Sequence, residues 1–162
     1  MVARRLLQYV AGGLGLFLAV GVGVGLAQNF TLSFLIEQLV DPGGNPLDNT
    51  LVGIVIVVDI ITPFSLGPLV AAGVGLVTGA GYDDREGVAA FVAGAVSGVG
   101  FVLMTLVALL LTFAVLQQYG TGGAGGGDSP FSPSALVPTV IQAGIPMTVV
   151  GGAAAYIRAR LA

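Results

Sequence analysis

The chain contains no cysteine, no histidine and no lysine among its 162 residues. Without cysteine it can form neither a disulfide nor a thiolate metal site, and without histidine it lacks the commonest general base and metal ligand. Only 8% of its residues are charged, too few to cover the surface of a soluble globule. We therefore expect no enzymatic activity, no cofactor and no bound metal.

The residues that are present are mostly apolar: 56% are hydrophobic, and the mean hydropathy is +1.01. Four apolar runs exceed the roughly 20 residues that a helix needs to cross a bilayer. Backbone groups in lipid must be paired within their own segment, and no alternating barrel pattern is present, so these runs predict helices. We predict an all-α integral membrane protein with one transmembrane domain, whose helices span residues 6–27, 51–80, 88–116 and 135–157.

The first run resembles a signal peptide, because a basic start leads into an apolar stretch with Gly25 and Ala27 at the spacing of a cleavage site. That stretch is about twenty residues long, which is long for a signal peptide and right for a membrane span. We interpret it as the first transmembrane helix.

All basic residues fall on one side of the predicted membrane, before the first helix, after the fourth helix, or in the loop 81–87. They are Arg4, Arg5, Arg85, Arg158 and Arg160. The positive-inside rule then places both termini in the cytoplasm and the chain in the plasma membrane. Asp83, Asp84 and Glu86 share the loop with Arg85 and could pair with the terminal arginines, each pair contributing about 1 kcal/mol or less.

The segment 30–40 carries its apolar residues on one helical face: Leu32, Leu35, Ile36, Leu39 and Val40. This pattern predicts a short amphipathic helix on the outer membrane surface. The alternative is that the first helix simply continues. Asn29 begins a glycosylation sequon, but so close to the membrane that we expect no modification. The glycine-rich loop 117–134 is predicted to be a flexible linker.

Small residues recur at four-residue spacing in the second and third predicted helices. They are Gly67, Ala71, Gly75 and Gly79 in the second, and Ala90, Gly94 and Gly98 in the third. Gly21 and Gly25 form a shorter run in the first helix. Such stripes let helix backbones approach closely in lipid. We expect the second and third helices to pack together through them.

The two halves of the chain show a weak repeat. "YVAG" at residues 9–12 recurs as "FVAG" at 91–94, and the pair Asp59 and Pro63 corresponds to Gln142 and Pro146, displaced by 83 residues. A 2+2 duplication would relate the halves by a pseudo-twofold axis along the membrane normal. The alternative is a chance match in a sequence rich in glycine, alanine and valine.

Asp59 is an acid inside an apolar run, four residues before Pro63. Because proline lacks an N–H, the backbone carbonyl of Asp59 loses its helical donor, so a carboxyl group and an unpaired carbonyl lie together. Gln142 and Pro146 repeat the arrangement with a neutral side chain. Both positions lie roughly 11 to 14 Å from the outer helix ends. Polar side chains at broken helices are typical of cation and proton sites in transporters.

The alternative is a structural role. An ionised aspartate at the bilayer centre costs about 2.5 to 3.5 kcal/mol, and no arginine lies near that depth. We therefore expect Asp59 to be protonated and hydrogen-bonded to Gln142, Thr62, Thr105 or a freed carbonyl. Such a contact between helices contributes about 0.6 to 2 kcal/mol.

Two functions are consistent with these features. The first is a non-enzymatic polytopic membrane protein that acts through helix packing, as a homo-oligomer or as an accessory or structural subunit. The second is a small proton or cation channel or transporter that uses Asp59. Intramembrane hydrolysis would need a second acid at similar depth, and the sequence has none there. We expect the lipid bilayer, further copies or other membrane subunits as partners, and no nucleic acid.

The layout of the whole chain, with a proline-broken second helix, an acidic inner loop and a third helix bearing "VAG", resembles an uncharacterised family of haloarchaeal four-helix transmembrane proteins. The acidic pI of about 4.4 and the use of arginine as the only basic residue suit very high salt. The resemblance rests on layout, and it implies no catalytic or binding residue.

Overall fold

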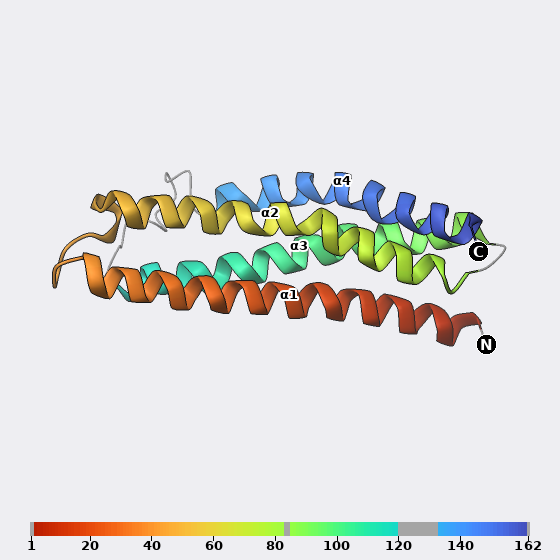
Figure 1. Cartoon of the computed structure of the whole chain (residues 1–162), viewed down its shortest axis with the longest axis horizontal. Coiled ribbons are helices and arrows are strands. Elements are labelled where there is room, and N and C mark those ends of the chain that lie inside the picture. Colours follow the sequence, from red (N-terminus) through yellow and green to blue (C-terminus); the bar gives the residue numbers. More distant parts are fainter. Residues whose placement is uncertain (1, 83–84, 120–132, 162) are drawn as a thin grey trace.

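The computed structural model describes residues 2–82, 85–119 and 133–161, and every regular element in these ranges is helical. Four long helices form an elongated bundle, with both termini at the same end (Figure 1). They are α1 (Val2–Leu39), α2 (Thr50–Gly79), α3 (Glu86–Gln118) and α4 (Pro133–Arg160), with a short 3-10 helix η1 (Pro46–Asp48) before α2. All four helices are long and apolar enough to cross a membrane, as predicted.

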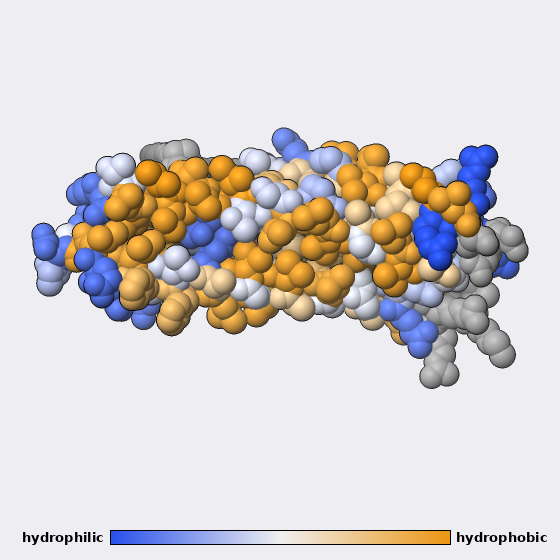
Figure 2. All heavy atoms as spheres, viewed as in Figure 1, coloured by the Kyte–Doolittle hydropathy of each residue, from blue (hydrophilic) through white to orange (hydrophobic). Residues whose placement is uncertain are grey.

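The outer surface of the bundle is strongly apolar between its two ends. Phe30, Leu69 and Phe91 are exposed by 77%, 70% and 76%. Figure 2 shows hydrophobic residues over most of the length, while hydrophilic residues gather mainly at the ends. Hydrocarbon solvates such a surface without the cost that water would impose. The side on which the termini lie stays a prediction, and Asp83 and Asp84 fall outside the described residues.

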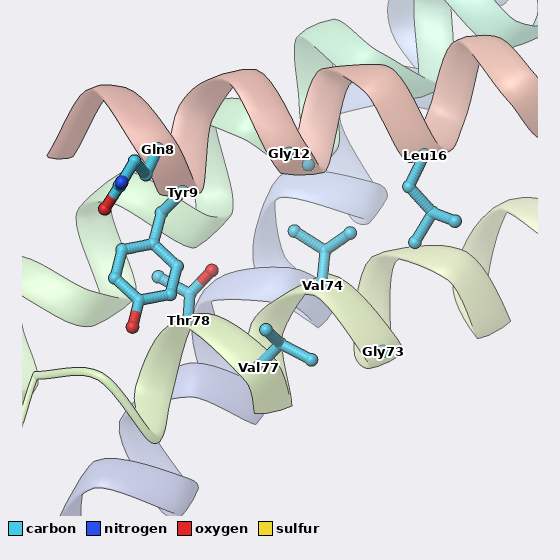
Figure 3. A pocket seen from close by; sticks show the side chains of 9 residues that line it. Gln8, Tyr9, Gly12, Leu16, Gly73, Val74, Val77 and Thr78 are labelled. Carbon is cyan, nitrogen blue, oxygen red and sulfur yellow. The ribbon is translucent and has the colours of Figure 1, made fainter. Parts of the chain in front are cut away.

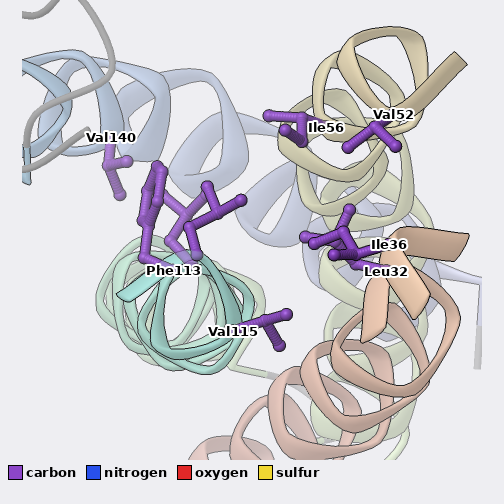
Figure 4. Packing of buried hydrophobic residues seen from close by; sticks show 9 residues of the cluster. Leu32, Ile36, Val52, Ile56, Phe113, Val115 and Val140 are labelled. Atoms are coloured by element: carbon purple, nitrogen blue, oxygen red, sulfur yellow. The ribbon is translucent and has the colours of Figure 1, made fainter. Parts of the chain in front are cut away.

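The prediction of a separate amphipathic helix at 30–40 is wrong, because α1 runs unbroken from Val2 to Leu39. The apolar face of this segment packs into the bundle instead of lying on the membrane surface. Leu32 and Ile36 are 0% and 2% exposed, in a cluster with Val52 of α2 and Val115 of α3 (Figure 4). An apolar stripe alone does not distinguish a lipid surface from a neighbouring helix.

A tight connection returns the chain from α1 to α2. Gly43 adopts a φ of 84°, which a residue without Cβ accepts at little cost. The Asn49 side chain then accepts hydrogen bonds from the backbone N–H groups of Leu51 and Val52, which caps the start of α2. This connection makes α1 and α2 antiparallel neighbours at the end of the bundle opposite the termini.

Glycines let α1 and α3 lie side by side in the same direction (Figure 1). A Cβ at Gly21 would lie 2.6 Å from the carbonyl oxygen of Met104, and one at Gly25 would lie 3.0 Å from the Cα of Ala108. Any larger side chain would therefore push the two backbones apart. The short glycine run of the first predicted helix thus faces α3.

The prediction that the stripes of α2 and α3 pack against each other is wrong, because both stripes mainly face α4. A Cβ at Gly75 would overlap the carbonyl of Gly151, and one at Gly94 would lie 2.9 Å from the carbonyl oxygen of Thr148. Gly67 is the exception, since it faces Phe101 of α3. α4 carries small residues at these contacts, namely Gly151, Gly152 and Ala154, so α2 and α3 both approach α4 closely.

Replacing Gly75 by leucine should lower the free energy of unfolding by about 1 to 3 kcal/mol, because the side chain would overpack the contact with Gly151. Gly53→Leu is the matched control on the same helix, since a Cβ there meets nothing within 4 Å. Unfolding with increasing dodecyl sulfate in mixed micelles, followed by circular dichroism, measures both. Equal stability of the two variants would contradict this account of the packing.

Candidate functional site at the proline break of α2

The break in α2 is closed by a side chain from α1. Pro63 is buried within α2 and cannot donate to the backbone carbonyl of Asp59. The side-chain Nε2 of Gln28 donates to that carbonyl oxygen instead, at 2.8 Å in the buried interior. The sequence predicts that the Asp59 carbonyl has no donor within α2, and the structure supplies one from α1. Sequence reasoning missed Gln28, which lies 31 residues before Asp59.

A second hydrogen bond extends this contact to α3. The hydroxyl of Thr112 lies 3.0 Å from Oε1 of Gln28 and 3.0 Å from the carbonyl oxygen of Ala108, so its single proton is shared between two acceptors. Gln28 and Thr112 are 6% and 1% exposed. The amide of Gln28 therefore donates one hydrogen bond and accepts another, and so joins α1, α2 and α3 inside the bundle.

The carboxyl group of Asp59 stays outside this chain of hydrogen bonds. Asp59 is 7% exposed, and it is the only buried acidic or basic side chain among the described residues. Its Oδ2 atom is buried without a hydrogen-bond partner, and so is Oγ1 of Thr105 on α3. Thr62 donates to the carbonyl of Val58 within its own helix, at 2.8 Å. We expected Thr62 or Thr105 to be hydrogen-bonded to the carboxyl group of Asp59, but neither threonine is.

Gln142 does not meet Asp59, because the side chains of Gln142 and Pro146 are exposed on the outer face of α4. Both Asp59 and Gln142 stand nine residues after the first residue of their helices, so they lie at similar depth, roughly 14 Å from those helix ends. The rotation of α4 about its own axis turns Gln142 away from the interior. The side chain makes no hydrogen bond to any residue in the described ranges.

Two further polar contacts between α1 and α3 were missed by sequence reasoning. Nδ2 of Asn29 donates to the carbonyl of Leu111 at 2.8 Å, so the nitrogen of the sequon is held against α3. At the end of α3, the hydroxyl of Tyr119 donates to Oε1 of Glu37 at 2.8 Å. This hydrogen bond to Glu37 raises the pKa of Tyr119. These contacts hold the two parallel helices in one register.

The chemistry available at the site is hydrogen bonding and the binding or release of a proton. The described residues contain no group of three or more metal-ligating side chains, and Asp59 has no second buried acid beside it in this part of the chain. The site can hold three helices together, and Asp59 offers one unpaired oxygen atom in their interior.

Comparison with known proteins finds no match among family models, curated protein sequences or solved structures.

Removing the Gln28 side-chain donor should lower the free energy of unfolding more when residue 63 is proline than when it is alanine. Gln28→Met should lower the free energy of unfolding by about 0.6 to 1.7 kcal/mol. In the Pro63→Ala background the cost should be smaller, because residue 63 then supplies a backbone N–H to the carbonyl of Asp59. A double-mutant cycle measured by dodecyl sulfate unfolding gives the coupling.

Thr112→Val serves as the control for this cycle, because it removes the other hydrogen bond of Gln28 and leaves the Asp59 carbonyl paired. Its effect should be the same with proline or alanine at position 63. An equal cost of Gln28→Met in both backgrounds would show that Gln28 does not compensate for the proline.

Proposed function

We propose that this chain is a non-enzymatic polytopic membrane protein that acts through helix packing, as a homo-oligomer or as an accessory or structural subunit of a haloarchaeal membrane complex. In this proposal the chain lies in the plasma membrane with both termini in the cytoplasm. The observation that carries it is the exposed amide of Gln142 at mid-depth in the membrane.

An exposed amide is costly in hydrocarbon. A polar group without a hydrogen bond costs about 2 to 7 kcal/mol in an apolar environment, and Pro146 also removes the helical donor of the Gln142 carbonyl. The neighbouring side chains Ile141 and Ile145 are apolar and 55% and 67% exposed. This face of α4 therefore presents hydrogen-bonding groups that only another polar molecule at the same depth can satisfy.

A second copy of the chain fits this requirement, because an amide carries both a donor and an acceptor. Two Gln142 side chains related by a twofold axis can bond to each other reciprocally. A shallow apolar groove of about 400 Å³ lies nearby between α3 and α4, lined by the exposed side chains of Val99, Leu103, Ile141 and Ile145.

Gln142→Leu should weaken association between chains about threefold to twentyfold, because it removes the hydrogen bonds across the contact. Energy transfer between separately labelled chains, measured in vesicles over a range of protein-to-lipid ratios, gives the affinity. Ile141→Leu is the control on the same face and should leave the affinity unchanged. Association of Gln142→Leu equal to that of the unaltered chain, or an unaltered chain that stays monomeric and copurifies with no subunit, would contradict the proposal.

A second candidate function is a small proton or cation channel or transporter that uses Asp59. It is supported by the unpaired, buried oxygen atoms of Asp59 and Thr105. Unpaired polar groups inside membrane bundles are costly, and they mark ion and proton paths in many membrane proteins. This candidate differs from the first in requiring movement of an ion across the bilayer.

Flux measurements separate the two functions. If Asp59 carries protons or cations, vesicles containing the chain should show proton or sodium flux, and Asp59→Asn should abolish it because the neutral amide cannot exchange a proton. Asp48→Asn, in the exposed turn before α2, is the control and should leave the flux unchanged. No flux with the unaltered chain would exclude the channel and leave the packing function.

A further inference from the structure

A cavity of about 510 Å³ opens between α1 and α2, in the half of the bundle that carries the termini (Figure 3). Its apolar part is formed by Gly12 and Leu16 of α1 and by Gly73, Val74 and Val77 of α2. In Figure 3 the side chains of Leu16 and Val74 extend into the space between these two helices. The volume lies within the range of about 300 to 1,000 Å³ that is typical of sites for small molecules.

Glycines create this space. A Cβ at Gly12 or at Gly73 would meet no atom within 4 Å, whereas a Cβ at Gly21, Gly25, Gly75 or Gly79 would press against the backbone of a neighbouring helix. The close contacts of α1 are with α3, through Gly21 and Gly25, and those of α2 are with α4. The two helices are thus held by other partners, and a gap remains between them.

The cavity lies within the membrane-spanning part of the chain and opens sideways. Its lining belongs to the apolar spans Leu6–Leu39 and Thr50–Gly79. Leu16 and Val77, at its mouth, are 47% and 66% exposed on the apolar outer surface. In a bilayer this mouth faces lipid chains rather than water.

Polar groups are confined to one end of the cavity. Gln8, Tyr9 and Thr78 lie there, in the first turns of the α1 span and the last turn of α2. The ring of Tyr9 packs on that of Tyr82, with centroids 5.5 Å apart, and the buried Tyr82 hydroxyl has no hydrogen-bond partner. Tyrosines at such positions lie at the level of the lipid headgroups.

We propose that this cavity binds one hydrocarbon chain of a membrane phospholipid, with the headgroup region against Tyr9 and Thr78. The order of the lining, polar at the membrane surface and apolar toward the centre, matches the order of groups along a phospholipid. The lining of α1 from Gln8 to Leu16 covers about 12 Å along the helix axis. A short space with polar groups at only one end suits a single flexible chain that carries a polar group at one end.

Photolabelling in vesicles tests this assignment, using phosphatidylcholine with a diazirine near the middle of one acyl chain. Val74 is only 4% exposed and lines the cavity, so a label on it requires a lipid chain inside. Mass spectrometry of the labelled chain should find Val74 modified. The double variant Gly12→Leu with Gly73→Leu should reduce that label about tenfold or more, because leucines displace the methylene groups of the lipid.

The matched control is Gly23→Leu with Gly53→Leu, which adds the same atoms to the same helices at positions where a Cβ also meets nothing. This control should keep the label on Val74. Thermal unfolding checks that both double variants fold, and leucine favours a helix over glycine at each position. The proposal is overturned if Val74 is unlabelled in the unaltered chain, if the cavity-filling variant is labelled equally, or if a second polypeptide is crosslinked at the cavity instead.

Discussion

The hydrogen bond from the Gln28 side chain to the Asp59 carbonyl is the contact on which the centre of the bundle depends. Hydrocarbon offers no water to a backbone carbonyl whose helical donor is missing, so a proline in a membrane helix requires a donor from elsewhere. Gln28 supplies it, and Thr112 occupies the remaining acceptor of the same amide. One side chain thereby fixes the rotation of α1 relative to α2 and α3. Because Gln28 bonds to the backbone carbonyl of Asp59, the carboxyl group of Asp59 is not needed to pair that carbonyl.

Glycine contacts determine which helices are neighbours elsewhere along the bundle. Gly21 and Gly25 hold α1 against α3, while Gly75 and Gly94 bring α2 and α3 onto α4. Where glycines face a neighbouring backbone they close a contact, whereas Gly12 and Gly73 line the cavity between α1 and α2. The same residue type therefore produces both the tight core and the proposed lipid site. Its effect depends on what lies opposite.

The sequence predicts the four helices well, because each apolar run is long enough to cross a bilayer as a helix and far longer than a transmembrane strand. The loss of a donor at Asp59 also follows from sequence, since the spacing between a proline and its acceptor is fixed in any helix. The partner Gln28 does not follow, because it depends on how α1 is rotated against α2. For the same reason the stripe of Gly75 was assigned to the wrong neighbour, and Gln142 was expected inside the bundle although α4 turns it outward. Periodicity identifies a face of a helix, but not what that face meets.

Solid-state nuclear magnetic resonance tests the central contact most directly. The chain would be labelled with ¹⁵N in its glutamine side-chain amides and with ¹³C in its aspartate backbone carbonyls, and placed in lipid bilayers. An N to O separation of 2.8 Å predicts a measurable through-space dipolar coupling between one glutamine side-chain nitrogen and the carbonyl carbon of one aspartate. That coupling should disappear in Gln28→Met. Its absence from the unaltered chain would contradict the account of how the proline break is closed.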